Sequence, residues 1–355
     1  MRQSLEDGSH ALVDVSPLQD KWGPLLRGRK LLTRLLLRRE YQRDRQPLVL
    51  EHYARQIEQR LRTEDVDVVV SPSTIPIARL RSSKPIVFWT DAVFAGLVDY
   101  YPDFSNLSRS SRAAGDRMEL AALERAALAV YSSEWAAEMA VDYYGADPAK
   151  VEVVPFGANL ERALPPDGVA SVVEARPADR CELLFVGVGW LRKGGDVAVE
   201  VARRLNRAGL ETRLTVIGSD PPEAPSFVRT LGFVSKASPE GRSLLERLLS
   251  EAHFLILPTR ADCTPMVLSE ANAFAVPTLT ARTGGIPTIV ADGRNGFAFP
   301  PEAEAQDYSD RILELLADPA RYRALALTAY EEYATRLNWE TAGGTVKGLL
   351  DRVVR

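Results

Sequence analysis

The sequence contains little of the chemistry that builds disulfide frameworks, zinc sites or membrane spans. Its 355 residues include only two cysteines, Cys181 and Cys263. Cysteines so few and so far apart argue against a disulfide framework or a zinc site, and they fit a reducing cytoplasm. No run of about 18 apolar residues occurs, so a membrane-spanning helix is not predicted. Residues 1–8 contain no apolar core typical of a signal peptide.

The bulk composition describes an ordinary globular chain. Hydrophobic residues make up 46% of it and charged residues 26%, as in many globular proteins. The net charge of -4 gives no general attraction to nucleic acid, so nucleic acid is not an expected partner. The length suits two domains of common size.

One stretch concentrates polar residues between a strand and a helix. Residues 254–258 form a short apolar run typical of a buried parallel strand. Asp262 lies in the loop that follows, and Glu270 lies eight residues later on a helix predicted from residue 266. Loops at the carboxyl ends of parallel strands bind ligands in open α/β sheets. The free N–H groups of a helix start suit a phosphate.

A second loop of similar design follows at once. Residues 276–280 predict the next strand, and Gly284-Gly285 lead into another helix with Pro287 in its first turn. A turn at 292–297 closes this segment. Two adjacent glycines allow backbone to approach a bulky ligand.

Together these loops resemble the donor site of family-4 glycosyltransferases, retaining sugar transferases of the GT-B fold. The family pattern has two glutamates separated by seven residues with Phe-Gly between them, then a Gly-Gly loop and Asp-Gly-x-x-Gly. Here Asp262 stands at the first glutamate, Glu270 at the second, and Thr264-Pro265 replaces Phe-Gly. Gly284, Gly285, Asp292, Gly293 and Gly296 match directly. The resemblance covers about residues 62–345.

The resemblance implies an α/β protein with two doubly wound Rossmann-like domains facing a cleft. We expect an acceptor-side domain at residues 1–164, a linker at 165–180 and a donor-binding domain at 181–337. A C-terminal helix at about 338–355 is expected to pack back on the first domain. That first domain lacks its usual first strand, although residues 11–15 could form a strand. We expect a start codon assigned too late rather than a lost strand.

The resemblance also assigns roles to single residues. The implied catalytic residues are Asp262, Lys193 and Asp91. The implied donor-binding residues are Glu270, Arg192, Gly189, Thr264, Met266, Val267, Gly284, Gly285 and Lys236. Glu270 would bind the ribose hydroxyls, Asp262 the transferred sugar, and Lys193 the diphosphate. Backbone N–H groups near Gly284 to Ile286 would assist Lys193.

Each of these residues also has a structural interpretation. Asp262 could be the N-cap of the following helix, Glu270 a surface helix residue, and Lys193 a solvated loop lysine. Asp91 could be a cap or turn residue. Thr90 stands where many relatives have a histidine, so no catalytic histidine is carried over.

Residues 25–45 are rich in both arginine and leucine. One interpretation is a helix lying on an anionic membrane surface. The other is a helix whose leucines pack on the domain and whose charges are solvated.

The implied function is transfer of a sugar from a nucleoside-diphosphate-sugar to an acceptor hydroxyl, with retention at the anomeric carbon and without a cofactor or metal. The acceptor is not predicted; it could be a saccharide, a lipid or a small molecule. A GT-B-fold protein that binds nucleotide-sugars without transferring them is the alternative. A nicotinamide-dependent dehydrogenase, suggested by Gly187 and Gly189, is weaker because Arg192 occupies the third glycine position. A cytoplasmic protein is expected, and the first interpretation of residues 25–45 would place it at the inner face of the membrane.

Overall fold

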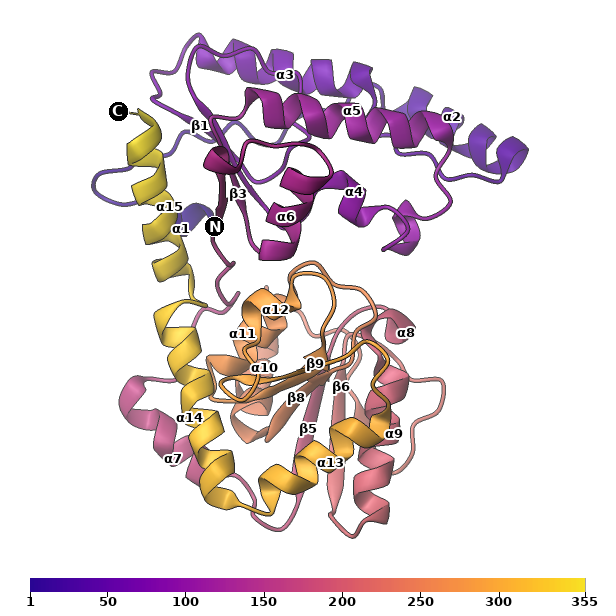
Figure 1. The fold of residues 1–355 in the computed structure, drawn as a ribbon, viewed down its shortest axis with the longest axis vertical. Helices are drawn as coiled ribbons and strands as arrows, with labels where there is room; N and C mark the ends of the chain where they lie inside the picture. The colour runs from indigo at the N-terminus through magenta and orange to yellow at the C-terminus, as the bar shows by residue number, and fades with distance from the viewer. Residues whose placement is uncertain (355) are drawn as a thin grey trace. The chain divides into compact units, whose positions relative to one another are not determined.

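The computed structural model describes residues 1–354, which form two compact α/β units (Figure 1). The first unit comprises Met1–Pro155 and Gly343–Arg355, and the second comprises Phe156–Ala342. The division therefore lies at Pro155–Phe156. Residues 165–180, expected as a linker, contain α7 (Val169–Glu174), and Val169 and Val173 lie in the core of the second unit.

The first unit is built on a parallel sheet with the strand order β1-β2-β3-β4. Its strands are β1 (Val69–Ser71), β2 (Ile86–Thr90), β3 (Leu128–Tyr131) and β4 (Val151–Val153). Its helices are α1 (Arg2–Leu5), α2 (Gly23–Leu37), α3 (Pro47–Leu61), α4 (Phe94–Leu97), α5 (Arg109–Arg125) and α6 (Glu134–Asp142), with 3-10 turns η1 (Pro102–Phe104) and η2 (Pro148–Lys150). Strands β1, β2 and β3 coincide with apolar runs in the sequence, whereas β4 is Val-Glu-Val.

Two local expectations for the first unit are wrong. Residues 11–15 form no strand, because the Asp14 carboxylate accepts the backbone N–H of Ser16 at 2.8 Å and turns the chain there. Within residues 1–354 no strand precedes β1. Helix α5 begins at Arg109 rather than near residue 116, because the Ser108 side chain caps it by accepting the Ser111 N–H.

Helix α2 is shorter than the basic segment that predicts it. It ends at Leu37 because Arg38 adopts a left-handed conformation with φ 50°. Gly23 and Leu26 are the buried residues of this helix. The interpretation in which its leucines pack on the domain is therefore wrong. No helix within residues 1–354 is both long and apolar enough to cross a membrane.

The second unit has a six-stranded parallel sheet with the order β10-β9-β8-β5-β6-β7. Its strands are β5 (Cys181–Val186), β6 (Thr212–Ile217), β7 (Val228–Thr230), β8 (Phe254–Leu257), β9 (Thr278–Ala281) and β10 (Gly296–Phe299). Numbered from β5, this is the doubly wound nucleotide-binding order, which reverses between β5 and β8. Every residue of β8 and β9 is buried, as expected for strands covered on both faces.

Helices α9 and α13 pack against each other, and α14 packs against α7 and α11. The helices of this unit are α7, α8 (Trp190–Lys193), α9 (Gly195–Arg207), α10 (Pro239–Glu251), α11 (Met266–Asn272), α12 (Ile286–Ile289), α13 (Ala305–Leu316) and α14 (Pro319–Thr335), after the 3-10 turn η3 (Pro166–Gly168). Helix α15 (Trp339–Val354) starts in the second unit and continues into the first.

Candidate functional site

The carboxyl ends of β5 and β8 are neighbours at the point where the strand order reverses. Leu183 and Leu184 of β5 pair with Phe254 and Leu255 of β8. Strand β5 leads into α8, and β8 leads through residues 258–265 into α11. Ligands of open parallel sheets bind at such a reversal. The fold thus brings together the two stretches that the sequence singles out.

Lys193 and Asp262 form an ion pair at this edge. The Lys193 Nζ donates to Asp262 Oδ2, and the side chains are 12% and 9% exposed. Lys193 is therefore not a solvated loop lysine. Asp262 is not the N-cap of α11, because Pro265 takes that position. Two largely buried charges that compensate each other are stable only as a pair, so an anionic ligand that binds Lys193 must also change the environment of Asp262.

Arg192 ties the two loops together. Its guanidinium donates to the carbonyl of Ala261 at 2.8 Å and to that of Val188 at 3.2 Å. Its own carbonyl accepts the backbone N–H of Arg260 at 2.8 Å. These bonds give Arg192 a positioning role between the loops. Gly189 precedes α8 with φ 88°, a conformation that favours glycine.

Gly194 lets the backbone that carries Lys193 approach the end of β8. It has φ 77°, and a Cβ built there would lie 2.0 Å from the carbonyl oxygen of Pro258. Any side chain at this position would collide with backbone, which cannot move aside cheaply. Gly194 therefore sets the close approach that brings Lys193 to Asp262.

Glu270 is buried on α11, with 2% exposure, so it is not a surface helix residue. Its Oε1 accepts from Lys236 Nζ at 2.5 Å. Burial raises the pKa of Glu270, opposed by the Lys236 ammonium and the backbone N–H of Asn159. That N–H is counted as a hydrogen bond to the carboxylate, but by distance and angle Oε2 has no hydrogen-bond partner within residues 1–354. A buried carboxylate oxygen without a partner is costly, so it indicates a place for a ligand donor.

The start of α11 is short and open. The helix runs for seven residues after Thr264 and Pro265. The N–H groups of Met266 and Val267 belong to the first turn and have no intrahelical acceptor. Their contact with a donor stays a prediction.

The Gly-Gly loop corrects one expectation. The Gly285 N–H donates to Cys263 O at 3.0 Å, and the Ile286 N–H donates to Thr283 O at 3.2 Å. These two amides are occupied within the protein, so they are not ready donors for a diphosphate. The loop of Gly284 and Gly285 instead packs against the Asp262 loop through Cys263.

Two buried amide side chains, missed in the sequence, fasten the Asp292–Gly296 turn to α11. The Asn295 Nδ2 donates to Asn272 Oδ1 at 2.8 Å and to Ile289 O at 2.9 Å. Both residues are 0% exposed. The Asp292 Oδ1 accepts the Ala298 N–H at 2.7 Å. The carboxylate and the amides thus shape the turn.

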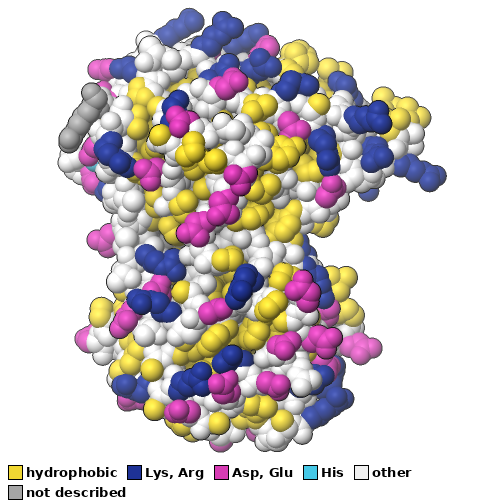
Figure 2. All heavy atoms as spheres, viewed as in Figure 1, with side chains coloured by type: hydrophobic (Ala, Val, Ile, Leu, Met, Phe, Trp, Pro, Cys, Tyr) yellow, Lys and Arg dark blue, Asp and Glu magenta, His cyan; other side chains and the backbone are white. Residues whose placement is uncertain are grey.

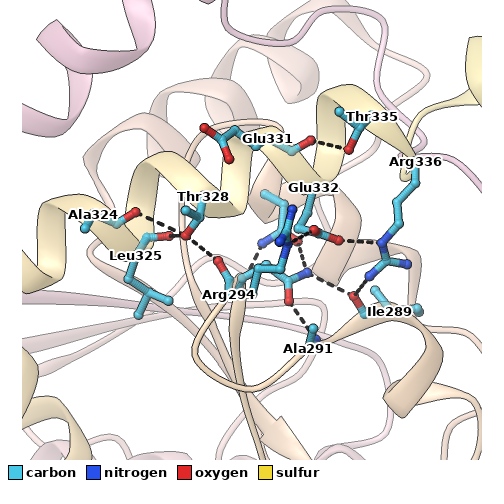
Figure 3. Close-up of polar contacts among 12 residues, drawn as sticks. Ile289, Ala291, Arg294, Ala324, Leu325, Thr328, Glu331, Glu332, Thr335 and Arg336 are labelled. Atoms are coloured by element: carbon cyan, nitrogen blue, oxygen red, sulfur yellow. Dashed lines mark hydrogen bonds and ion pairs between the residues drawn. The ribbon is translucent and has the colours of Figure 1, made fainter.

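Glu332 on α14 also holds this segment and was missed in the sequence. Figure 3 shows its carboxylate between Arg294 of the turn and Arg336. The Arg336 guanidinium also donates to the carbonyls of Thr288 at 2.7 Å and Ile289 at 2.8 Å, at the end of α12. Burial raises the pKa of Glu332, but the two guanidiniums outweigh it and hold the pKa below its ordinary value. No sequence signal indicates this pairing, because Arg294 is 38 residues away from Glu332.

Asp91 belongs to the first unit, directly after β2. Val93 is the N-cap of the next helix, α4, so Asp91 is not a cap. The carboxyl end of a parallel strand is a ligand-binding position, and contact with the sugar stays a prediction for Asp91. Among residues 1–354 no three or more His, Cys, Asp or Glu side chains gather as metal ligands would.

Comparison with known families matches both halves of the chain. Residues 15–162 match the Glycosyltransferase Family 4 model, and residues 180–318 match the Glycosyl transferases group 1 model. A D-inositol 3-phosphate glycosyltransferase from Acidothermus cellulolyticus is 30% identical over 257 residues, which are 67% of this chain and 55% of that protein. A D-inositol 3-phosphate glycosyltransferase 2 from Catenulispora acidiphila is 29% identical over 60% of this chain and 53% of its own length. The chain spans about half the length of these curated relatives.

Solved structures share the fold at low identity. Sucrose-phosphate synthase from Thermosynechococcus elongatus superimposes with a TM-score of 0.66 at 19% identity, covering 86% of this chain and 78% of that one. Anabaena HepE, in complex with UDP and glucose, superimposes with a TM-score of 0.61 at 15% identity, covering 85% of this chain and 81% of that one. Residues 15–162 therefore match a family 4 glycosyltransferase domain and residues 180–318 a group 1 domain, and the chain has the α/β fold of GT-B glycosyltransferases.

Proposed function

We propose that the chain is a retaining glycosyltransferase that moves a hexose from a nucleoside-diphosphate-sugar to an acceptor hydroxyl without a divalent metal. The observation that carries this proposal is the buried Glu270 Oε2, which has no partner within the described residues 1–354. It lies on the helix that follows the Lys193–Asp262 pair. The matches to glycosyltransferase domain models support the same class of reaction.

Glu270 is proposed to bind the ribose of the donor. A carboxylate accepts several hydrogen bonds, and Lys236 leaves Oε2 available. Two neighbouring ribose hydroxyls would satisfy that buried oxygen. Anabaena HepE, similar in fold, was solved in complex with UDP-glucose, which supports a uridine donor as the first choice for testing.

Lys193 is proposed to exchange partners when the donor binds. The diphosphate is anionic, so the ammonium can turn from Asp262 toward it, and the carboxylate then becomes available to the hydroxyls of the sugar. During transfer the bond from the anomeric carbon to the diphosphate oxygen breaks, the bond to the acceptor oxygen forms, and the proton of the acceptor hydroxyl passes to the departing diphosphate. Negative charge grows on the departing diphosphate. Lys193, with the Met266 and Val267 amides, would stabilise that charge.

A donor panel tests the proposal. Titration calorimetry with UDP, GDP and ADP identifies the base, and transfer or hydrolysis is then measured with sugars of the best nucleotide in excess chelator. Turnover in excess chelator, with the same anomeric configuration in the product as in the donor, supports the proposal. Activity that needs magnesium or manganese contradicts the metal-independent mechanism, and a product of inverted configuration contradicts retention. Tight nucleotide binding with no turnover over a broad acceptor panel would favour a binding protein.

A further inference from the structure

Helix α2 exposes a continuous face of leucine. Leu25, Leu31, Leu32, Leu35, Leu36 and Leu37 are 57–76% exposed, whereas Leu26 is 3% exposed. Isolated exposed leucines are common on protein surfaces, but a contiguous apolar patch marks an interaction site. Six exposed leucines within one helix and its last turn therefore need a partner.

The leucines lie on the side of α2 that faces away from the protein. At about 100° per residue, all but Leu37 fall within an arc of about 140°, which we call the leucine face. Leu26 lies well outside this arc and packs with Tyr41 and Val49. The Arg29 guanidinium lies 5.2 Å from the centroid of the Tyr41 ring. The helix is thus attached along one side and presents its leucine face on the other.

Basic residues border the leucine face. Between Gly23 and Arg39 the sequence has no Asp or Glu and carries Arg27, Arg29, Lys30, Arg34, Arg38 and Arg39. All six are exposed. At the position of α2, Figure 2 shows hydrophobic side chains beside Lys and Arg side chains. The chain as a whole has a net charge of -4, so this is a local concentration of positive charge.

The basic surface continues into a hollow of about 680 Å³ beyond the end of α2. Leu37, Arg39, Arg109 and Arg112 are among the residues that line it. Arg112 pairs with Asp99 at 2.7 Å, and Arg39 donates to the Asn106 side chain at 2.7 Å. The hollow combines guanidinium groups with an apolar rim, the combination that suits a phosphate attached to an acyl chain.

We propose that the leucine face and the neighbouring hollow bind the surface of an anionic phospholipid bilayer. The leucines enter the boundary between head groups and acyl chains, while the arginines and Lys30 contact lipid phosphates. A second copy of the chain is a poor partner for this face, because two such helices would each bring six positive charges to the interface and repel each other. This proposal stands independently of the proposed glycosyl transfer.

Vesicle flotation of the full chain tests the proposal. Vesicles of phosphatidylcholine with about one third phosphatidylglycerol should bind the wild type, and vesicles of phosphatidylcholine alone should bind it far less. Each basic residue near an anionic surface strengthens binding about fivefold. Replacing Arg27, Lys30 and Arg34 with Gln should therefore weaken binding by about a hundredfold. The matched control replaces Arg55 and Arg60 of α3 and Arg62, the residue that follows it, with Gln. All three are also exposed, and this variant should bind as the wild type does.

A second pair of variants isolates the leucine face. Leu32→Ser, Leu35→Ser and Leu36→Ser together should abolish flotation. The control variant combines Leu48→Ser, Leu120→Ser and Tyr143→Ser, which change three other exposed apolar residues of the same unit. This variant should still float with the vesicles. Equal melting temperatures for both triple variants show that the fold survives. Absence of wild-type flotation, equal flotation of both variants, or a wild-type dimer that the leucine substitutions dissociate would overturn the proposal.

Discussion

Lys193 and Asp262 compensate each other's charge across 69 residues of sequence, at the point where β5 and β8 meet. Gly194 makes the approach possible, and Arg192 fixes the two loops to each other. In the proposed mechanism each partner of this pair has a separate ligand group, the diphosphate for Lys193 and the sugar for Asp262. In that proposal the pair is the closed state of a site that a donor opens.

Asp262→Asn should separate nucleotide binding from turnover. The substitution frees the Lys193 ammonium, so the affinity for the nucleoside diphosphate alone should be kept or increased. Loss of a charged hydrogen-bond acceptor for the sugar should lower kcat/KM by about 1.5–3 kcal/mol, or about 10- to 150-fold. Calorimetry and steady-state kinetics give both values. Asp310→Asn, an exposed change on α13, is the control. A parallel loss of nucleotide affinity and turnover would refute the separate roles.

Glu270→Gln should weaken nucleotide binding because one buried carboxylate acceptor is lost. The expected cost is about 1.5–3 kcal/mol in the free energy of binding. Since burial raises the pKa of Glu270, protonation on acidification begins at a higher pH than for an ordinary glutamate. Wild-type affinity should therefore fall as the pH is lowered, and the affinity of the glutamine variant should fall less. Calorimetry across pH 5–8 measures the nucleotide affinity of both proteins. Identical dissociation constants for the wild type and the variant would exclude the ribose contact.

Glu332→Gln should loosen the Asp292–Gly296 turn. It leaves Arg294 and Arg336 without their shared counter-charge and should cost about 1–3 kcal/mol in the free energy of unfolding. The pKa of Glu332 is lower in the folded state than in the unfolded state. The stabilisation that Glu332 gives is therefore complete at a pH above its unfolded-state pKa, and it is lost as the pH falls through its folded-state pKa. Chemical denaturation at several pH values checks this. The neighbouring exposed Glu331 supplies the control Glu331→Gln, and equal stability of the two variants would count against the role of Glu332.

Glu119 on α5 should make the stability of the protein fall as the pH rises. It is 1% exposed, and burial raises its pKa from 4.5 to about 7. The Thr74 hydroxyl donates to its Oε2 at 3.1 Å. The Arg45 charge and the Phe94 N–H oppose the shift, whereas Asp116 adds to it. Between the ordinary pKa of 4.5 and the folded-state pKa of about 7, the folded state binds more protons than the unfolded state. The free energy of unfolding therefore declines with increasing pH.

Glu119→Gln removes this titration. The variant should match the wild type near pH 5 and exceed its stability at pH 8 by at most about 3 kcal/mol. Glu124→Gln changes an exposed carboxyl on the same helix and should leave the pH profile unchanged. Denaturant titrations at pH 5 and pH 8 provide the comparison. A wild type that is equally stable at both values, or a variant with the same pH profile, would contradict the assignment.

The sequence predicts most of the parallel sheets, because strands such as β8 are unbroken apolar runs between turns. It also singles out Lys193 and Asp262, in the segments that follow β5 and β8, and Glu270 on α11, whose roles stay predictions. Side-chain pairs between distant segments cannot be predicted from the sequence in the same way. Nothing near Lys193 in the chain indicates Asp262, and nothing near Arg294 indicates Glu332, because both contacts arise only when distant loops meet.

Local competition explains the remaining differences. Ser108 starts α5 early by capping it, and Asp14 turns a segment that has the composition of a strand. The amides of Gly285 and Ile286 look available in the sequence but are bonded to Cys263 and Thr283. The exposure of the α2 leucines could not be predicted either, because the same spacing suits a helix packed on its domain.

Turnover by Lys193→Ala is the most direct test of the account, because it separates a transferase from a binding protein. Steady-state kinetics with the best donor compare the wild type, Lys193→Ala and Lys193→Arg. Loss of a charge that stabilises the departing diphosphate should lower kcat about a hundredfold or more. The larger planar guanidinium of Lys193→Arg should recover only part of it. A kcat for Lys193→Ala within about twofold of the wild type, with only the donor KM raised, would contradict the account, because Lys193 would then bind the ground state alone.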